Sequence, residues 1–291
     1  MAIETVAVIG AGQMGAGIAQ TAAQAGLAVL LSDISLELAE KAKAKIGKGL
    51  DRLVAKDKLS AEAATALLGR ITPVGDYAPL AGADIIIEAA TEREDIKLKI
   101  FEAAGKVLKA DGILATNTSS ISITRMSRAA PDQGRFIGMH FFNPVPVMKL
   151  VEVIPGLATS AQTTAATVAL GEKMGKEVVL AQDDPGFVVN RIFVPFLNEA
   201  MFVLGNGTGS VADIDKGVKL GLAHPMGPLE LADFIGLDTL LEIMKVYLTE
   251  TGDSKYRPAP LLQRYVAAGW LGRKTGRGFY DYSGDTPVPT R

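Results

Sequence analysis

The sequence lacks cysteine and contains only two histidines in 291 residues. The absence of cysteine excludes disulfide bonds, thiolate nucleophiles and thiolate metal ligands, and it is typical of proteins in a reducing compartment. We therefore expect a cytoplasmic protein with no metal at its active site. The scarcity of histidine narrows the search for a side chain that exchanges a proton near neutral pH to His140 and His224.

The sequence also lacks a strong charge of either sign and a long hydrophobic run. Its 30 basic and 32 acidic residues give a net charge of -2, whereas nucleic acids and anionic membranes require a basic surface. The longest apolar stretch, Phe187 to Leu204, contains polar residues and a proline, so it does not fit a membrane span. The N-terminus leads directly into a strand pattern, and we expect no signal peptide. Nucleic acid and membrane are therefore not expected as partners.

Short apolar runs alternate with helical periodicity through the first half of the chain, which is typical of a parallel sheet flanked by helices. We predict an α/β, doubly wound Rossmann-type domain. The predicted strands are Thr5–Ile9, Ala28–Leu31, Ile85–Ile87, Ile113–Ala115, Phe136–Met139, Leu150–Ile154 and Val178–Leu180. Two of the predicted helices are marked by apolar positions at Met14, Ile18, Ala22 and Ala25, and at Ile96, Ile100, Ala104 and Leu108.

Strand-like runs disappear after the segment Asp183-Asp184-Pro185-Gly186, and the pattern becomes helical. We therefore predict two domains, residues 1–184 and an all-α domain of residues 185–291. One helix of the second domain is expected to begin after Ser210, with Asp213 completing a capping box, and to end near Gly221. The polar residues 283–291 are expected to form a loose tail.

A glycine motif follows the first predicted strand and opens a helix. Gly10 permits a tight turn, Gly12 lets the backbone approach a pyrophosphate, and Gly15 allows close packing of helix and strand. A plain glycine-rich turn is the alternative. Asp33 ends the next strand, about 20 residues later, where a carboxylate binds ribose hydroxyls and repels a 2′-phosphate. The motif thus predicts NAD rather than NADP, although Asp33 also suits a helix N-cap.

Residues 41–58 form a basic segment in a slightly acidic protein. Its basic residues are Lys41, Lys43, Lys45, Lys48, Arg52, Lys56 and Lys58. A predicted buried stripe places these charges on the outer face of a helix, and its members are Leu38, Ala42, Ile46, Leu50 and either Leu53 or Val54. The segment is either a solvated helix face or a binding site for a phosphate-bearing substrate such as CoA.

His140 ends a predicted strand, and ligands of doubly wound sheets bind beyond the carboxyl ends of the strands. Glu152 lies inside the next, otherwise apolar strand, where an unpaired charge is costly to bury. Lys149 and His140 are the two candidate partners for this carboxylate. Residues 117–120 end another strand with an asparagine and three hydroxyl side chains, which suit either a ligand site or a turn or helix cap.

Taken together, these motifs resemble the 3-hydroxyacyl-CoA dehydrogenase family, and within it the short bacterial 3-hydroxybutyryl-CoA dehydrogenases. The resemblance covers nearly the whole chain. The segments that carry it are the glycine motif, Ile87-Glu88-Ala89-Ala90, Asn117-Thr118-Ser119-Ser120, Met139-His140-Phe141-Phe142-Asn143-Pro144, Pro185-Gly186-Phe187-Val188-Val189-Asn190-Arg191, His224-Pro225-Met226-Gly227-Pro228 and Gly269-Trp270-Leu271-Gly272-Arg273-Lys274.

The resemblance implies NAD-dependent oxidation of an acyl-CoA substrate, a role in fatty acid metabolism, and a homodimer. It implies that His140 and Glu152 form the catalytic pair, and that Ser119 and Asn190 hold the substrate oxygens and the imidazole. It places Lys56 at the CoA. The residues expected around the NAD are Gly10, Gly12, Gln13, Met14, Gly15, Asp33, Glu92, Lys97, Asn117, Ser119, Asn143 and Lys274.

Two other functions are compatible with parts of the sequence. A different two-domain hydroxyacid dehydrogenase would use a lysine of the helical domain, for which Lys216, Lys219 and Lys245 are available. The His140 and Glu152 pairing would then have no purpose. A nucleotide-binding structural protein would keep the fold without the chemistry, yet every acid–base position is present.

The basic segment generates a first prediction. Replacing Lys56 with alanine should raise KM for the CoA ester and leave kcat nearly unchanged, because a contact to a remote phosphate stabilises ground state and transition state alike. Steady-state kinetics check this expectation. A lowered kcat at unchanged KM would show that Lys56 does not bind the CoA.

Overall fold

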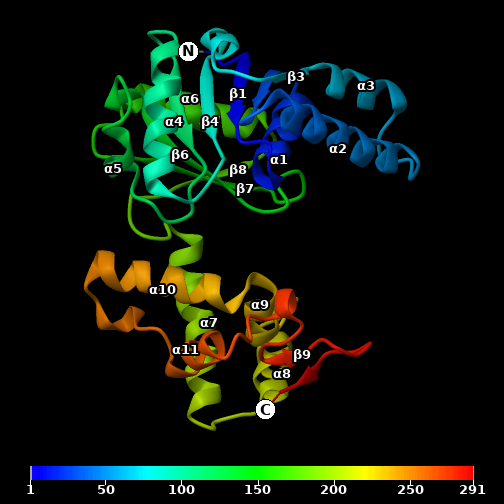
Figure 1. Cartoon of the computed structure of the whole chain (residues 1–291), viewed down its shortest axis with the longest axis vertical. Coiled ribbons are helices and arrows are strands. Elements are labelled where there is room, and N and C mark those ends of the chain that lie inside the picture. The colour runs from blue at the N-terminus through cyan, green and yellow to red at the C-terminus, as the bar shows by residue number, and fades with distance from the viewer. Residues whose placement is uncertain (1, 291) are drawn as a thin grey trace. The chain divides into compact units, whose positions relative to one another are not determined.

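The computed structural model describes residues 2–290 (Figure 1). The described chain divides into two compact units, one that ends at Phe187 and one that begins at Val188. The boundary predicted from the sequence, between residues 184 and 185, lies a few positions earlier. The predicted and the observed boundary both lie in the segment between the last strand of the first unit and the first helix of the second.

Within residues 2–290, the first unit contains an eight-stranded sheet of order β3-β2-β1-β4-β5-β6-β7-β8. The strands are β1 Thr5–Ile9, β2 Ala28–Ser32, β3 Ile71–Val74, β4 Ile85–Glu88, β5 Ile113–Thr116, β6 Phe136–Phe141, β7 Leu150–Pro155 and β8 Glu177–Leu180. The chain runs outward from β1 through β2 and β3, then returns to β4 on the other side of β1. This reversal is the topological switch point at which open α/β sheets bind ligands.

Two features of the sheet differ from the prediction. The sequence reading missed β3, because Pro73 interrupts a short apolar run, and proline is tolerated mainly on edge strands such as this one. The sheet is also not wholly parallel, since β7 runs antiparallel to β6. The chain between Phe141 and Leu150 is a short loop without a helix, and parallel neighbours require a longer crossover.

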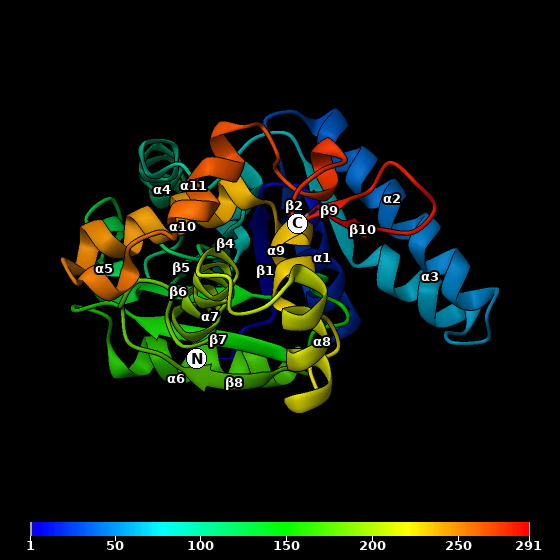
Figure 2. The same ribbon diagram turned by 90° about the horizontal axis from the view of Figure 1, so that it is seen from below.

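Helices cover both faces of the sheet (Figure 2), which confirms the doubly wound prediction. Val6 and Val8 of β1 join a core with helices α1, α2, α3 and α6, whereas Ala7 and Ile9 join a second core with α4 and α5. Alternate residues of one strand thus serve opposite faces. The helices are α1 Gln13–Gln24, α2 Leu36–Val54, α3 Ala61–Gly69, α4 Glu94–Val107, α5 Ile123–Ser127 and α6 Ala161–Lys173, with 3-10 turns η1 Ala78–Gly82 and η2 Gln133–Arg135.

The buried faces of two helices differ from those predicted. On α2, Leu38 is 39% exposed and Ala39 is buried in its place. On α4, the buried positions are Lys97, Phe101 and Ala104. The predicted face was Ile96, Ile100, Ala104 and Leu108, so only Ala104 of it is buried. A pattern of apolar residues cannot assign a lysine to a buried face, and Lys97 is buried because it has carboxylate partners there.

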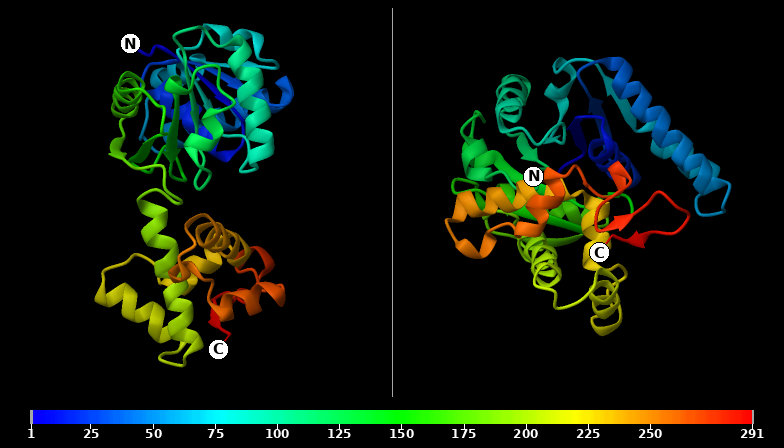
Figure 3. Two further views of the ribbon diagram at one scale, coloured as in Figure 1. Left: turned by 90° about the vertical axis from the view of Figure 1, so that its left-hand side faces the viewer. Right: turned by 60° about the horizontal axis from the view of Figure 1, so that its bottom comes forward.

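The second unit is helical. Its helices are α7 Val189–Gly205, α8 Val211–Gly221, α9 Pro228–Ile235, α10 Leu237–Thr251 and α11 Pro260–Ala267, with 3-10 turns η3 Ser254–Tyr256 and η4 Arg273–Thr275. The long helix α7 (Figure 3) packs against α8, α9, α10 and α11. The predicted cap of α8 is confirmed, because the Ser210 hydroxyl accepts a hydrogen bond from the Asp213 backbone amide at 3.1 Å.

The expected loose tail is wrong in part. The short strands β9 Tyr280–Asp281 and β10 Val288–Pro289 form an antiparallel hairpin, drawn in red in Figure 3. The buried carboxylate of Asp233 accepts hydrogen bonds from the amides of Phe279 and Tyr280 at 3.0 and 2.9 Å. Burial raises the pKa of Asp233 to about 6. The segment that contains β9 is thus bound to the helical core through Asp233 and also through Asp215, which accepts a hydrogen bond from the Tyr280 hydroxyl at 2.7 Å.

None of the helices in residues 2–290 combines the length and the apolar character that a membrane crossing needs.

Two glycines at the start of α1 differ in their surroundings. A Cβ atom on Gly15 would overlap the carbonyl oxygen of Gly10, so this glycine allows α1 to lie close to the turn after β1. A Cβ atom on Gly12 would meet no described atom within 4 Å. Gly15 therefore serves the packing of the fold, whereas Gly12 borders open space.

This contrast gives a prediction. Gly15→Ala should lower the free energy of unfolding by about 1–3 kcal/mol, the usual cost of overpacking, and should also weaken NADH binding. Gly12→Ala should weaken NADH binding without changing the melting temperature. Thermal melts and NADH titration of both variants check it, and equal losses of stability would contradict the assignment.

Candidate active site

The antiparallel register of β6 and β7 places His140 directly opposite Glu152. Residues in such a pair point to the same face with their Cβ atoms about 5 Å apart. Here the imidazole Nδ1 lies 2.8 Å from Glu152 Oε2. Glu152 is fully buried and His140 is 6% exposed. Lys149, the other partner considered from the sequence, is exposed, so the structure supports His140 as the partner of the carboxylate.

Two aromatic rings flank the imidazole. The ring centroid of Phe142 lies 4.6 Å from that of His140, and that of Phe187 lies 5.7 Å away. Because Nδ1 faces a carboxylate, which only accepts hydrogen bonds, Nδ1 carries the proton and the neutral ring keeps its lone pair at Nε2. The arrangement therefore leaves one nitrogen able to accept a proton from a ligand.

The glycine loop after β1 fits a dinucleotide. Gly10 has a φ of +100°, and a Cβ atom there would lie 2.6 Å from Ala90 Cα, so only glycine suits this close approach to the loop after β4. The space beside Gly12, at the N-terminus of α1, suits an approaching pyrophosphate. The side-chain Nε2 of Gln13 donates a hydrogen bond to Asn143 Oδ1 at 2.9 Å. Met14 packs against the hydrophobic core.

Asp33 lies just beyond β2, where it contacts the glycine loop. Its Oδ2 accepts a hydrogen bond from the Ala11 amide at 2.6 Å, and its Oδ1 accepts one from Ile34 at 2.7 Å. The N-cap alternative for Asp33 is wrong, because Ser35 caps α2. Asp33 thus joins the carboxyl ends of the neighbouring strands β1 and β2.

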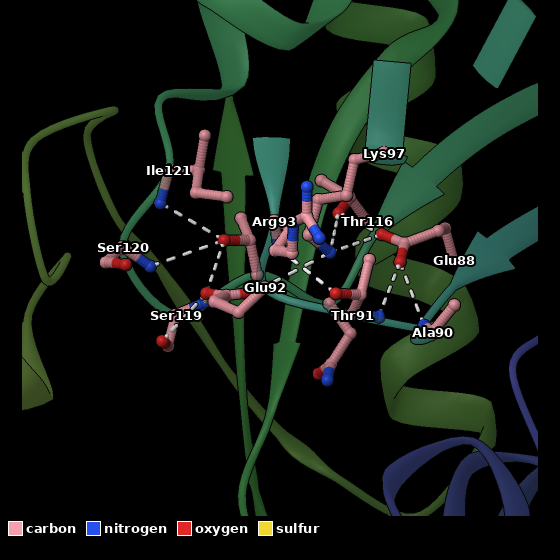
Figure 4. A network of polar contacts seen from close by, with 12 residues as sticks. Glu88, Ala90, Thr91, Glu92, Arg93, Lys97, Thr116, Ser119, Ser120 and Ile121 are labelled. Atoms are coloured by element: carbon pink, nitrogen blue, oxygen red, sulfur yellow. Dashed lines mark hydrogen bonds and ion pairs between the residues drawn. The ribbon is translucent and has the colours of Figure 1, made fainter. Parts of the chain in front are cut away.

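The loops after β4 and β5 are joined through Glu92 (Figure 4). Its Oε1 accepts hydrogen bonds from Thr118 Oγ1 at 2.7 Å, from the Ser119 amide at 2.7 Å and from Ser119 Oγ at 2.9 Å. Its Oε2 lies 3.6 Å from Lys97 Nζ. The side chain of Lys97 is 1% exposed, so its ammonium faces protein carboxylates.

Glu88 also belongs to this cluster, and its role was not predicted from the sequence. Its Oε2 lies 2.5 Å from Lys97 Nζ and accepts a hydrogen bond from Thr116 Oγ1 at 2.8 Å, while its Oε1 accepts one from the Ala90 amide at 2.8 Å. The sequence does contain a sign of this role, because Glu88 is a carboxylate in an otherwise apolar strand, and a buried carboxylate needs a partner. The same reasoning identified Glu152.

The segment 117–120 performs structural tasks as well. Asn117 Oδ1 accepts a hydrogen bond from the Phe141 amide at 2.8 Å, which fixes the backbone next to His140. Thr118 Oγ1 accepts a hydrogen bond from the Ile121 amide at 3.1 Å. The turn that was the alternative to a ligand site in this segment is therefore present. The cap of α5 is supplied by Ser122.

The remaining candidates belong to other elements of the chain. Asn190 is in the first turn of α7, and Lys274 forms an ion pair with Asp238 at 2.5 Å. Lys56 is exposed in the turn after α2. The ring of His224 packs against that of Phe196 at 5.4 Å.

The chain matches two family profiles in tandem. Residues 5–184 match the 3-hydroxyacyl-CoA dehydrogenase NAD binding domain, and residues 186–282 match the 3-hydroxyacyl-CoA dehydrogenase C-terminal domain. The chain belongs to the 3-hydroxyacyl-CoA dehydrogenase family. It is an oxidoreductase whose cofactor is NAD.

Individual relatives match over nearly their whole length. The chain is 53% identical to a 3-hydroxybutyryl-CoA dehydrogenase of Bradyrhizobium diazoefficiens, with 99% of both chains covered. It is 50% identical to a probable 3-hydroxybutyryl-CoA dehydrogenase of Bacillus subtilis, with 98% of this chain and 100% of the relative covered. The crystal structure of (S)-3-hydroxybutyryl-CoA dehydrogenase from Ralstonia eutropha has a TM-score of 0.96 at 52% identity, and the match covers 97% of this chain and 100% of that one.

The position of Asp33 generates a prediction on cofactor preference. The protein should use NADH in preference to NADPH. Asp33→Ala should lower the ratio of kcat/KM for NADH to kcat/KM for NADPH and weaken NADH binding. The substitution removes a hydrogen-bond acceptor for the ribose, a charge that repels the 2′-phosphate, and the contact to Ala11. Asp33→Asn is the matched control, since its amide oxygen can still accept from Ala11. The measurement is kcat/KM for both cofactors, and comparable values in the unmodified protein would contradict the role of Asp33.

Proposed function

We propose that this protein catalyses the reversible oxidation of (S)-3-hydroxybutyryl-CoA to acetoacetyl-CoA. The observation that carries the proposal is the buried His140–Glu152 pair, which lies in the same unit as a glycine loop suited to NAD. Relatives named for this substrate match over almost the entire chain. An acid–base pair beside a dinucleotide site is what the oxidation of a secondary alcohol requires.

His140 and Glu152 perform the proton transfer. The residues around the glycine loop would hold NAD, which would supply the hydride acceptor. Nε2 of His140 takes the proton of the substrate hydroxyl as general base, and in the reverse reaction it returns the proton. Glu152 accepts the Nδ1 hydrogen bond, with 2.8 Å between Nδ1 and Oε2. It thereby fixes the tautomer and stabilises the imidazolium as it forms.

Other residues bind and orient the reactants in this proposal. Ser119 and Asn190 hold the substrate oxygens and the imidazole, and Lys56 binds the CoA. NAD is held by Gly10, Gly12, Gln13, Met14, Gly15, Asp33, Glu92, Asn117, Ser119, Asn143 and Lys274. Lys97, which was also predicted to lie around the NAD, is buried, so in this proposal it contributes through its contacts with Glu88 and Glu92. In this proposal the protein forms a homodimer and works in the cytoplasm.

One assay tests the proposed activity. The protein is mixed with NADH and acetoacetyl-CoA, and the loss of NADH absorbance is followed. Turnover that requires the CoA ester, with none on free acetoacetate, is expected. No turnover on acetoacetyl-CoA would overturn the proposal, and turnover on free hydroxyacids or ketoacids instead would favour the lysine-based dehydrogenase considered from the sequence.

The two residues of the pair should act as one unit. His140→Ala should lower kcat by roughly 10²–10⁴, the usual value of positioned proton transfer. Glu152→Gln should cost less, because an amide oxygen still accepts the Nδ1 hydrogen bond but does not offset the developing charge. The double variant should be little slower than His140→Ala alone, because Glu152 then has no imidazole to orient.

Three controls accompany these variants. NADH affinity should remain unchanged. His140→Ala should lower the melting temperature, because it removes the imidazole partner of the buried Glu152 carboxylate, so melting curves must show that each variant is folded at the assay temperature. His224→Ala should retain most activity, because its ring packs against Phe196 outside the pair. Fully multiplicative losses in the double variant would remove the pair from the mechanism.

A further inference from the structure

The contacts of Glu92 depend on a buried ion pair beneath it. Glu92 is 43% exposed at its side chain, yet its Oε1 accepts three hydrogen bonds from Thr118 and Ser119. Its Oε2 lies 3.6 Å from Lys97 Nζ, which is held at 2.5 Å by Glu88 (Figure 4). The chain of contacts runs from the fully buried end of β4 outward to the hydroxyl of Ser119.

Stability alone does not explain this buried pair. The side chains of Glu88 and Lys97 are each 1% exposed. Removing such charges from water costs about as much as their attraction returns, and apolar replacements of similar volume are often equally stable. Thr116 Oγ1 lies within 3.3 Å of Lys97 Nζ and donates to Glu88, which completes the polar cluster. Glu88 also accepts from the Ala90 amide, so it shapes the loop that carries Glu92.

A second lysine–carboxylate pair lies at the opposite end of the same strand and provides a comparison. Asp84 directly precedes β4 and forms an ion pair with Lys109, and its Oδ2 also accepts hydrogen bonds from the amides of Glu4 and Thr5. This pair is partly exposed and lies at the amino ends of the strands, away from the carboxyl ends at which ligands bind.

We propose that Glu88, Lys97 and Thr116 are positioning residues for Ser119. Glu88 and Thr116 hold the Lys97 ammonium inside the protein, Lys97 orients Glu92, and Glu92 fixes both the backbone amide and the hydroxyl of Ser119. The inference rests on the proposed function, in which Ser119 holds a substrate oxygen. It assigns the buried cluster to the reaction rather than to the folding of the domain.

The test removes both buried charges while keeping their volume. Glu88→Gln/Lys97→Met should keep the melting temperature of the unmodified protein, because no unpaired charge remains. It should lower kcat on acetoacetyl-CoA by about tenfold or more, since small misplacements of a substrate-holding group are costly. The matched control, Asp84→Asn/Lys109→Met, should leave kcat unchanged. A kcat loss of the same size in the control, or a large drop in melting temperature in the test variant alone, would overturn the proposal.

Two further variants test the route through Glu92. Thr116→Val removes the hydroxyl at nearly constant volume and should lower kcat by a few-fold, and Thr116→Ser should restore it. Adding Glu92→Gln to Glu88→Gln/Lys97→Met should cause little further loss, because both changes break the same chain of contacts. Independent, multiplicative losses would contradict the proposed order.

NADH binding, followed by fluorescence titration without substrate, provides a readout apart from activity. The Kd for NADH should rise by a smaller factor than kcat falls in the test variant, because NADH also has proposed contacts outside Glu92 and Ser119, whereas Ser119 holds the substrate oxygen. A rise in Kd as large as the fall in kcat would overturn the proposal. If the unmodified protein itself fails to reduce acetoacetyl-CoA, the proposed function fails, whereas an active protein with unaffected variants refutes only the positioning proposal.

Discussion

The burial of Glu152 is the constraint on which the candidate active site depends. A carboxylate with no exposed surface, inside a strand of apolar residues, requires a polar partner because an unpaired buried charge is strongly destabilising. The antiparallel register of β6 and β7 supplies His140 at the facing position. A slip of one residue would turn Glu152 to the other face of the sheet, so the register, the charge and the orientation of the imidazole are determined together.

The same principle operates at several strand ends of the N-terminal unit. Asp33, after β2, is satisfied by the amide of Ala11 in the glycine loop, and Glu88, at the end of β4, is satisfied by Lys97 and Thr116. In each case a carboxylate at the end of a strand holds a loop on which the proposed site depends. At Glu88, which is 1% exposed, water cannot take the place of these protein partners, so its contacts depend on the apolar interior of the sheet.

Much of this arrangement is predictable from the sequence, for physical reasons that also explain the failures. Apolar runs predict the strands because a doubly wound sheet is buried on both faces. That Glu152 has a polar partner is predictable because burying its charge alone is costly, whereas the choice of His140 over Lys149 depends on the register of β6 and β7. The strand β3 was missed because Pro73 interrupts it, and the direction of β7 was missed because a run of apolar residues carries no information on its neighbour's orientation. The buried position of Lys97 depends on Glu88, which the helical periodicity of α4 does not reveal. The roles of Asn190, Lys56 and Lys274 stay predictions, because they depend on contacts with NAD and acyl-CoA.

The tautomer of His140 tests the central claim most directly. Replacing His224 leaves a single imidazole in the chain, so the ring nitrogens of ¹⁵N-labelled protein can be assigned by NMR without ambiguity. At a pH well above the ordinary titration range of histidine, Nδ1 should show the chemical shift of a protonated nitrogen and Nε2 that of a nitrogen with a free lone pair. A neutral ring protonated at Nε2 would contradict the account, because that nitrogen would then have no lone pair with which to accept the substrate proton.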